Sequence, residues 1–377
     1  MNNTLIANSG TSIIFPKGTY KLDKTVVVPA NTALFLYGSI FNQTGNIAMF
    51  RLEAGAKLFG GVFNGYTSSG FQYNNSGIVG DYCHNAIIRD GAFNGFGNTA
   101  IRLKHAKSLL IENCTSDRAV YAGIMLFSCE NAVVRNNTIS NVTIGVNNPK
   151  NCYGISLTRD ETDDIIADPP CTNCKIQNNY IVNVAPWTGL DMHGGDYNVL
   201  DGNTIIDCAS GISVAPTDNS ANVKTWCANF NTITNNRIIR SSNTGIILNG
   251  INLDKPSICN TIKGNTLYKC GKQGFNYYGG ITVCYTDETL VSSNILTFPY
   301  PNGIIFDYGN YGFVCNGNSV TNPEDMVITQ PMAITCREGK NKGIITGNSC
   351  IGNSAATKTY DNYYGIYVQS GTENDVV

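Results

Sequence analysis

The chain is poor in charge, because Asp, Glu, Lys and Arg make up 14% of its 377 residues and the formal net charge is −2. A nucleic-acid-binding protein needs a basic surface, so this composition argues against that class. No run of about 18 apolar residues is present, so we expect no membrane span. The first residues, Met-Asn-Asn-Thr-Leu-Ile-Ala, show neither the basic nor the apolar region of a signal peptide.

Residues that favour helices are also scarce, whereas Gly (39 residues), Asn and Thr are abundant, which is typical of a turn-rich β protein. Cysteine is also frequent, with 14 residues. Cys208 and Cys270 each follow a repeated Asn by five residues, which predicts buried free thiols rather than disulfides. The Cys171–Cys174 pair has metal-like spacing, but no second pair follows it, so we expect no metal or other cofactor.

Internal repeats are the strongest feature of the sequence. A small residue followed by an apolar one opens a short apolar run at intervals of 22 to 35 residues, at Ala100, Gly123, Gly154, Gly189, Gly211, Gly245, Gly280, Gly303, Ala333 and Gly365. A second set of positions falls between them, at Asn113, Asn137, Asn179, Asn203, Asn236, Asn265, Asn294, Asn318 and Asn348. Repeats of this length predict a solenoid in which each repeat forms one coil.

The alternation within each run predicts strands with one inward face. Ile155 and Leu157 would point inward and Ser156 outward, and the Asn positions would form turns whose amides bond along the stack. The predicted fold is therefore an all-β, single-stranded parallel β-helix of about a dozen coils. We expect one continuous domain with irregular coils over 1–70 and regular coils over 71–377. Neither end shows a polar cap, so we expect the chain to be part of a longer one.

The segments Ile13-Ile-Phe-Pro-Lys-Gly-Thr-Tyr20 and Leu58-Phe-Gly-Gly-Val-Phe-Asn-Gly65 resemble the opening segment of the pectate-lyase-like β-helix superfamily, which includes many phage tailspike depolymerases. The resemblance implies a right-handed helix, a homotrimer, and a location on a virion tail or outside the cell after assembly in a reducing cytoplasm. Those relatives usually carry a helix ahead of this segment, and the sequence indicates none here.

One repeat differs from the others, because Gly189-Leu-Asp-Met-His-Gly-Gly brings both an Asp and a His into its opening strand. Alternation would turn Asp191 and His193 outward. From the opening Gly to the next repeated Asn this coil has 14 residues, whereas the coils that open at Gly154 and Gly211 have 25. The extra segments, 158–170 and 215–226, would wall a groove with Asp191 and His193 on its floor. Loops carried by a rigid scaffold are common functional sites.

Taken with the resemblance to tailspike depolymerases, these residues predict an enzyme that hydrolyses a bacterial surface polysaccharide. Glycoside hydrolysis needs one carboxylic acid to protonate the leaving oxygen and one carboxylate to activate water or attack. Asp191 would be one of them, and Asp160 or Glu161 the other. His193 would tune Asp191 or bind substrate, and Arg159 would hold an acidic sugar. The remaining predicted substrate contacts are Trp187, Lys224 and Trp226.

Other interpretations use the same residues. A uronate lyase or C5-epimerase is one, because Thr188-Gly-Leu-Asp-Met-His193 is similar to the Tyr-Gly-Phe-Asp-Pro-His motif of alginate C5-epimerases. Thr188 replaces the tyrosine that would donate a proton in that family. A fibre or adhesin that binds glycan without cutting it is another. Asp191 and His193 could also be a solvated pair, and the acidic segment after Arg159 a solvated loop or a calcium site.

Overall fold

The computed structural model describes residues 2–66, 74–146, 151–159, 168–219, 224–271, 279–321, 332–352, 364–369 and 373–377. The chain folds into two compact units, Met1–Asp191 (unit 1) and Met192–Val377 (unit 2). The boundary near residue 70 that the sequence indicated stays a prediction.

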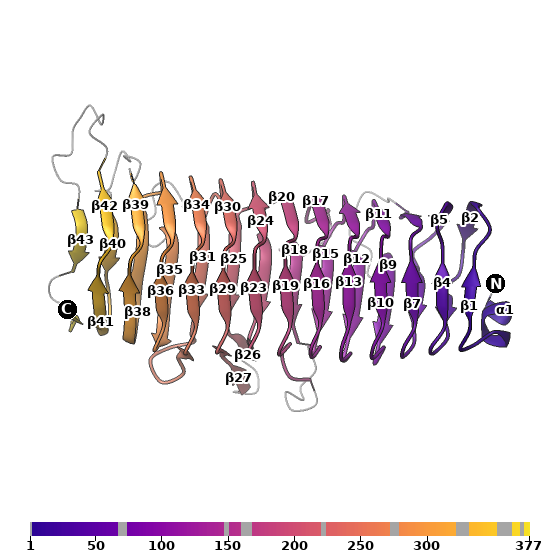
Figure 1. Cartoon of the computed structure of the whole chain (residues 1–377), viewed down its shortest axis with the longest axis horizontal. Coiled ribbons are helices and arrows are strands. Elements are labelled where there is room, and N and C mark those ends of the chain that lie inside the picture. The colour runs from indigo at the N-terminus through magenta and orange to yellow at the C-terminus, as the bar shows by residue number, and fades with distance from the viewer. Residues whose placement is uncertain are drawn as a thin grey trace. The chain divides into compact units, whose positions relative to one another are not determined.

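Unit 1 is built from coils of three strands, and equivalent strands of successive coils pair in parallel to form three faces (Figure 1). Face 1 contains β1 (Ser12–Ile14), β4 (Ala33–Phe35), β7 (Lys57–Phe59), β10 (Ile87–Arg89), β13 (Leu110–Glu112), β16 (Val133–Arg135) and β19 (Lys175–Gln177). Face 2 contains β2 (Gly18–Leu22), β5 (Ser39–Gln43), β8 (Val62–Asn64), β11 (Ala92–Asn94), β14 (Thr115–Asp117), β17 (Thr138–Val142) and β20 (Tyr180–Val184). Face 3 contains β3 (Val26–Val28), β6 (Ala48–Leu52), β9 (Ser76–Asp81), β12 (Thr99–Lys104), β15 (Ala122–Phe127), β18 (Tyr153–Thr158) and β21 (Thr188–His193).

Unit 2 repeats this plan. Face 1 contains β23 (Val199–Asp201), β29 (Thr232–Thr234), β33 (Thr261–Lys263), β36 (Leu290–Ser292), the end of β38 (Asn302–Asn316), β41 (Asn341–Thr346) and β44 (Asp375–Val376). Face 2 contains β24 (Thr204–Ile206), β30 (Arg237–Ile239), β34 (Thr266–Tyr268), β37 (Ile295–Thr297), β39 (Ser319–Thr321) and β42 (Ser349–Ile351). Face 3 contains β25 (Ser210–Ala215), β31 (Thr244–Asn249), β35 (Gly279–Asp287), the start of β38, β40 (Met332–Cys336) and β43 (Tyr364–Val368). The remaining strands lie between these faces: β22 (Gly195–Asp196), β26 (Thr217–Asn219), β27 (Lys224–Trp226), β28 (Ala228–Asn229) and β32 (Ser257–Ile258).

The pairing register confirms the predicted parallel β-helix. Ile124 pairs with Ile155 and Leu126 with Leu157, and all four are almost fully buried. A strand has a side-chain period of two, so a slip of one residue would turn these aliphatic rows outward. The core of face 2 in unit 1 holds an aromatic row as well, in which the rings of Phe63 and Phe93 stack with centroids 4.7 Å apart. The coils are therefore held in register by buried rows of like residues.

The repeated Asn residues form the predicted ladder. In unit 2 the backbone N–H of Asn236 donates to Oδ1 of Asn265 at 2.9 Å, and Asn265 donates in the same way to Asn294. The left-handed backbone lies one position earlier, at residues such as Gly202 and Gly264. Asn113 differs from the other repeated Asn residues, because it is itself the left-handed residue of its turn, with φ of 55°. The next residue, Cys114, takes the ladder position and donates its backbone N–H to Oδ1 of Asn137. Each turn thus uses one residue for the tight bend and the next for the ladder.

The segment ahead of the first strand departs from the sequence-based expectation. Residues Asn2–Ala7 form helix α1, which lies against β3, and Leu5 is buried there. The expectation that no helix precedes the opening segment is wrong, because a six-residue helix is too short to show a clear period in the sequence. Among the described residues no helix is long and apolar enough to cross a membrane.

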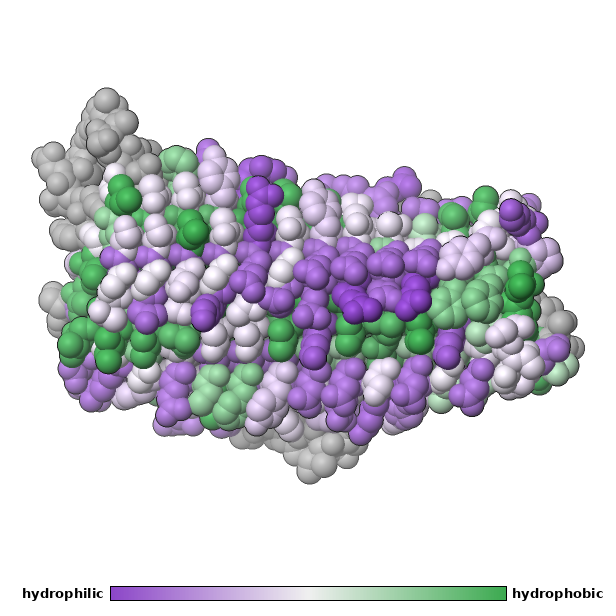
Figure 2. Space-filling view, viewed as in Figure 1, coloured by the Kyte–Doolittle hydropathy of each residue, from purple (hydrophilic) through white to green (hydrophobic). Residues whose placement is uncertain are grey.

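The surface of face 1 in unit 1 sorts its side chains into two rows. Figure 2 shows a hydrophilic band beside a hydrophobic one over β10, β13 and β16. In the hydrophilic row Arg89 and Arg135 both pair with Glu112, and the Nε of Arg135 lies 2.7 Å from Oε2 of Glu112. Glu112 therefore offsets part of the positive charge of the two arginines in this row.

We expect Asn265→Ala to lower the free energy of unfolding by about 3 kcal/mol, because it leaves buried polar partners unsatisfied. Asn265 accepts from Asn236 and donates to Ile233 O and to Oδ1 of Asn294, both at 3.0 Å. Urea denaturation measures the loss. The exposed neighbour Thr266 provides the control, since Thr266→Ala should cost less than about 1 kcal/mol. Equal losses in the two variants would contradict the role of the ladder.

Candidate functional site

The outward side of face 3 in unit 1 carries a continuous row of side chains. Register places Arg51, Val79, Arg102, Met125 and Ser156 in this row on successive coils. The alternate residues, such as Ile78, Ile101, Ile124 and Ile155, are buried in the core. Successive rungs are roughly 4.8 Å apart, so the row spaces its side chains evenly along the face. Asp191 continues it, because the Ser156 Oγ donates to Oδ2 of Asp191 at 3.2 Å.

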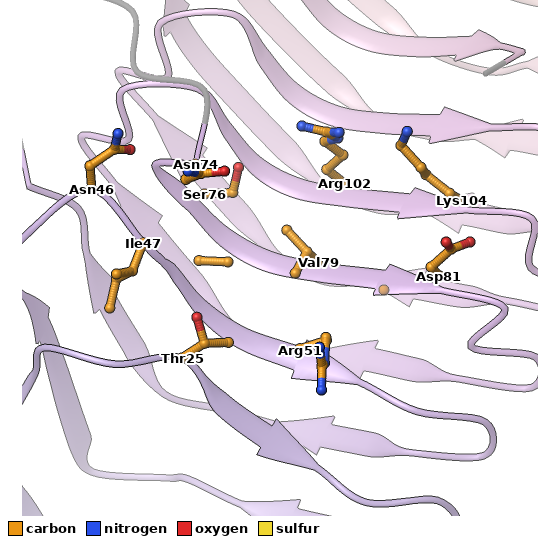
Figure 3. A pocket seen from close by; sticks show the side chains of 12 residues that line it. Thr25, Asn46, Ile47, Arg51, Asn74, Ser76, Val79, Asp81, Arg102 and Lys104 are labelled. Carbon is orange, nitrogen blue, oxygen red and sulfur yellow. The ribbon is translucent and has the colours of Figure 1, made fainter. Parts of the chain in front are cut away.

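A cavity of about 390 Å³ opens on β6, β9 and β12, and we call it the cationic pocket. Among the described residues that line it are the cations Arg51, Arg102 and Lys104 and the carboxylate of Asp81. Figure 3 shows Arg102 and Lys104 on one strand, Val79 and Asp81 on the next, and Arg51 on the third. Three of its lining residues are cations, in a chain with a low overall content of charge.

Asp81 belongs to a bridge that closes one side of this pocket. Its Oδ1 lies 2.6 Å from Nδ1 of His105, and Nε2 of the same ring lies 2.7 Å from Oδ1 of Asp168. Both ring nitrogens of His105 thus face carboxylate oxygens. The Tyr82 ring stacks on His105 with centroids 4.9 Å apart.

An aromatic cluster follows on the next two coils. Met125 and Tyr153 pack with Ala122, and the partly buried Phe127 and Tyr121 pack against them. The Phe127 ring lies under two cations of the pocket, with Arg102 Cζ 5.6 Å and Lys104 Nζ 5.2 Å from its centroid. These contacts join the cationic pocket to an apolar patch that a sugar ring can stack on.

The carboxylate of Asp191 lies beyond this cluster. Burial raises the pKa of the Tyr153 phenol, and the negative charge of Asp191 raises it further. The phenol oxygen of Tyr153 accepts a hydrogen bond from Nδ2 of Asn151 at 2.9 Å. Tyr153 therefore stays protonated at neutral pH close to an acidic side chain.

The predicted site residues of unit 1 lie in different surroundings. Asp191 is on the outward side as expected, but only 1% of its surface is exposed. Arg159 is also buried, whereas Trp187 is 40% exposed on the turn before β21. Asp160 and Glu161 lie outside the described residues. Their roles as catalytic or substrate-binding groups stay predictions.

The other predicted residues belong to unit 2. His193 is half-buried at the end of β21. The segment after β25 forms a hairpin in which β26 pairs with β27, with Thr217 opposite Trp226. Trp226 lines a cavity of about 560 Å³ together with Asp196, Asp254 and Lys255. The side chain of Lys224 lies outside the described residues. The groove between the two long segments stays a prediction.

Sequence reasoning missed the cationic pocket and the His105 bridge. The coil period could have revealed the pocket, because residues one coil apart become neighbours in adjacent strands. Asp81 pairs with Lys104 in this way, and Val79 pairs with Arg102. Aligning the coils by their buried residues would have brought Arg51 into the same row. The bridge to Asp168 has no such signal, because a long segment of irregular length separates it from β18.

The three faces and in-register pairing make this chain a parallel β-helix protein. The model of the NosD family, described as periplasmic copper-binding protein (NosD), matches residues 17–225. This is more than half of the chain, and the chain belongs to that family. No curated protein matches it.

Several solved structures share the fold. The catalytic unit of a GH87 α-1,3-glucanase from Streptomyces thermodiastaticus strain HF3-3 is 15% identical with a TM-score of 0.56, and the match covers 99% of this chain and 65% of that one. A PL6 alginate lyase in complex with a trisaccharide is 13% identical with a TM-score of 0.62, covering 97% and 86%. The tailspike protein of E. coli bacteriophage HK620 in complex with a pentasaccharide is 12% identical with a TM-score of 0.63, covering 100% and 75%. This chain thus spans less than two thirds of the glucanase unit.

Copper is the metal that the family description implies, and the described residues do not fit it. Among them no group of three or more His, Cys, Asp or Glu side chains is placed to hold a metal ion. Copper takes imidazole or thiolate ligands, but the two ring nitrogens of His105 face carboxylates. Burial raises the pKa of the Cys171 thiol well above the usual range. A hydrogen bond with Cys171, together with burial, does the same for the pKa of Cys174. These thiols therefore stay protonated, which disfavours metal binding.

All fourteen cysteines are free thiols, most of them buried, as the sequence predicted. We expect iodoacetamide to label Cys83 and Cys114 very slowly at pH 8 in the native protein, because burial raises the pKa of each to about 12 and the thiolate is the reactive form. Labelling should quicken as the pH rises toward that value. In urea all the thiols should react, as mass spectrometry can count. If two thiols stay unlabelled after denaturation without reductant, those two cysteines form a disulfide.

Proposed function

We propose that this chain hydrolyses a bacterial surface polysaccharide, with Asp191 as one of two catalytic carboxylates. The observation that carries the proposal is the Asp191 carboxylate in the outward row of face 3, bonded by Ser156 and next to an aromatic cluster. Burying a carboxylate costs free energy, and residues kept in such surroundings are often functional. The fold is shared with proteins named as a glucanase and a tailspike, which supports a glycan as the substrate.

The chemistry needs a proton donor for the glycosidic oxygen and a base or nucleophile on the other side of the bond. In this proposal Asp191 is the base or nucleophile, and the hydrogen bond that Ser156 donates holds its carboxylate in position. Asp160 or Glu161 supplies the proton, and His193 tunes the charge at the site. Aromatic side chains of the cluster stack on sugar rings. The further substrate contacts proposed are Arg159, Trp187, Lys224 and Trp226.

We expect Asp191→Asn to lower turnover on a cleaved capsule by a factor on the order of 10² or more, because it removes a catalytic charge. The amide oxygen of the variant can still accept the hydrogen bond from Ser156, so the temperature of thermal unfolding should change little. His193→Ala should give a loss of similar order. New reducing ends measure turnover, and Asp23→Asn, an exposed position in unit 1, is the control. Wild-type turnover in both site variants would refute the assignment.

A uronate lyase is the second candidate, and Tyr153 is the observation that favours it. The motif lacks a tyrosine at Thr188, but Tyr153 is a protonated phenol whose pKa responds to Asp191. In β-elimination a base removes the C5 proton, a double bond forms between C4 and C5, and the C4–O4 bond breaks. The leaving oxygen takes a proton, which Tyr153 could donate.

The absorbance of an unsaturated uronate separates the two reactions. Under the lyase mechanism absorbance rises during digestion, and Tyr153→Phe should lower that rate by a factor on the order of 10². Under the hydrolase mechanism reducing ends appear without the rise, and Tyr153→Phe changes turnover much less. If a bound capsule gives neither signal, the chain is a glycan-binding fibre or adhesin and both enzymatic proposals fail.

We also propose a homotrimer on a virion tail or outside the cell, assembled in a reducing cytoplasm. The free thiols and the fold shared with a phage tailspike support this location. The family description names a periplasmic protein. Light scattering of the purified chain tests the trimer.

A further inference from the structure

We propose that the cavity of unit 2 that is lined by Trp226, Asp196, Asp254 and Lys255 binds a neutral sugar residue of the polysaccharide. We call it the Trp226 cavity. This inference rests on the proposed function, because it takes a glycan as the ligand. It adds the class of sugar, and it adds three polar side chains that sequence reasoning had not singled out: Asp196, Asp254 and Lys255.

The Trp226 cavity lies at a corner of the coils, where short strands stand between the long faces. β22 pairs in parallel with β28, with Asp196 opposite Asn229, and β32 lies beside β28. The hairpin β26–β27, which carries Trp226, stands out from the coils of unit 2 (Figure 1). Residues of the hairpin and of all three short strands line a volume of about 560 Å³, which is a usual size for a small-molecule site.

The first argument is that the indole and a carboxylate are held together. The backbone N–H of Asn229 donates to Oδ1 of Asp196 at 3.0 Å. Burial raises the pKa of the Asp196 carboxyl, and hydrogen bonds from Asn229 and from the Trp226 indole partly offset this rise. The ring and the carboxylate are therefore fixed relative to each other before a ligand binds. A sugar can stack its apolar face on such a ring while a hydroxyl group donates to the carboxylate.

The second argument is the charge of the lining. Among the described residues that line the cavity, Asp196 and Asp254 are carboxylates and Lys255 is a cation. Ionised carboxylates only accept hydrogen bonds, so they match the hydroxyl groups of a sugar, and an ammonium group donates to its oxygens. A further carboxylate would be repelled by the two that are present. A neutral sugar therefore fits this cavity better than a uronate.

The third argument is that the turn with Asp254 and Lys255 is held in place. Oδ1 of Asn252 accepts the backbone N–H groups of both residues, each at 3.0 Å. The thiol of Cys227 donates to the backbone oxygen of Lys255 at 3.3 Å, which ties the turn to the chain just after the hairpin. Both charged side chains are exposed. They can thus reach a ligand from a fixed backbone, which lowers the entropy lost on binding.

The fourth argument is an exposed aromatic pair close to the cavity. Tyr197 and Phe230 directly follow Asp196 and Asn229 in the chain, and their rings stack with centroids 4.9 Å apart. Tyr197 is 55% exposed and Phe230 is 39% exposed, although burial of large rings is favourable. A polysaccharide that extends beyond the cavity would find a further apolar surface for its sugar rings here.

A glycan array of neutral and uronate-containing bacterial oligosaccharides tests the proposal. We expect the wild type to bind neutral members, and calorimetry with the tightest of them gives the Kd. Trp226→Ala and Asp254→Ala should each weaken that binding about tenfold. Trp226→Tyr, which keeps an aromatic ring, should recover part of the loss. Asp375→Ala removes an exposed carboxylate elsewhere in unit 2 and should leave the binding unchanged.

The two tryptophans of the chain allow the bound sugar to be located by fluorescence. In Trp187→Phe the only tryptophan left is Trp226. A neutral oligosaccharide that covers its indole should shift the emission to shorter wavelength. The same concentration of oligosaccharide should give a smaller shift in the double variant Trp187→Phe, Asp254→Ala.

Three results would overturn the proposal: no neutral member of the array binds, Trp226→Ala binds neutral members like the wild type, or uronate members bind more tightly with the same dependence on Trp226. Asp191→Asn separates this proposal from the enzymatic one, because it should bind the neutral oligosaccharide like the wild type. Binding without cleavage by the wild type would leave the Trp226 cavity standing and refute the hydrolase. Cleavage by the wild type, with unchanged binding in Trp226→Ala, would refute the cavity alone.

Discussion

In-register backbone pairing between successive coils is the constraint on which the rest of each unit depends. Strands such as β15 and β18 pair residue by residue, and this stacks Ile on Ile in the core. The Asn ladder adds side-chain bonds that run along the coils at the turns. Because neighbouring side chains on a strand point to opposite sides, fixing the inward row fixes the outward row as well. The candidate site therefore takes its spacing from the core.

The outward side of face 3 in unit 1 combines three kinds of surface. It begins with cations around a cavity, continues with aromatic rings and ends at a carboxylate. The aromatic rings suit the apolar faces of sugar rings, and the carboxylate suits the chemistry of a glycosidic bond. The NosD description names copper, but the side chains of this face suit a ligand rich in oxygen atoms, such as a glycan.

The fold could be predicted from the sequence because the small-apolar and Asn positions recur from coil to coil over most of the chain after residue 100. The same period would have placed Arg51 and Arg102 in one row. Helix α1 could not be predicted, since it is too short to show a pattern. The burial of Asp191 and the bridge from His105 to Asp168 also escaped prediction. The bridge depends on a tertiary contact made by a segment that interrupts the repeat.

The hairpin β26–β27 leaves the coil directly after β25, yet β25 keeps its pairing with β31, with Ile212 opposite Ile246. An insertion at that corner thus leaves the adjacent ladder undisturbed. Lengthening or replacing corner segments is consequently almost neutral for folding, while it changes what the surface can recognise. Such a scaffold can acquire new specificities by exchanging loops, without redesigning the interior.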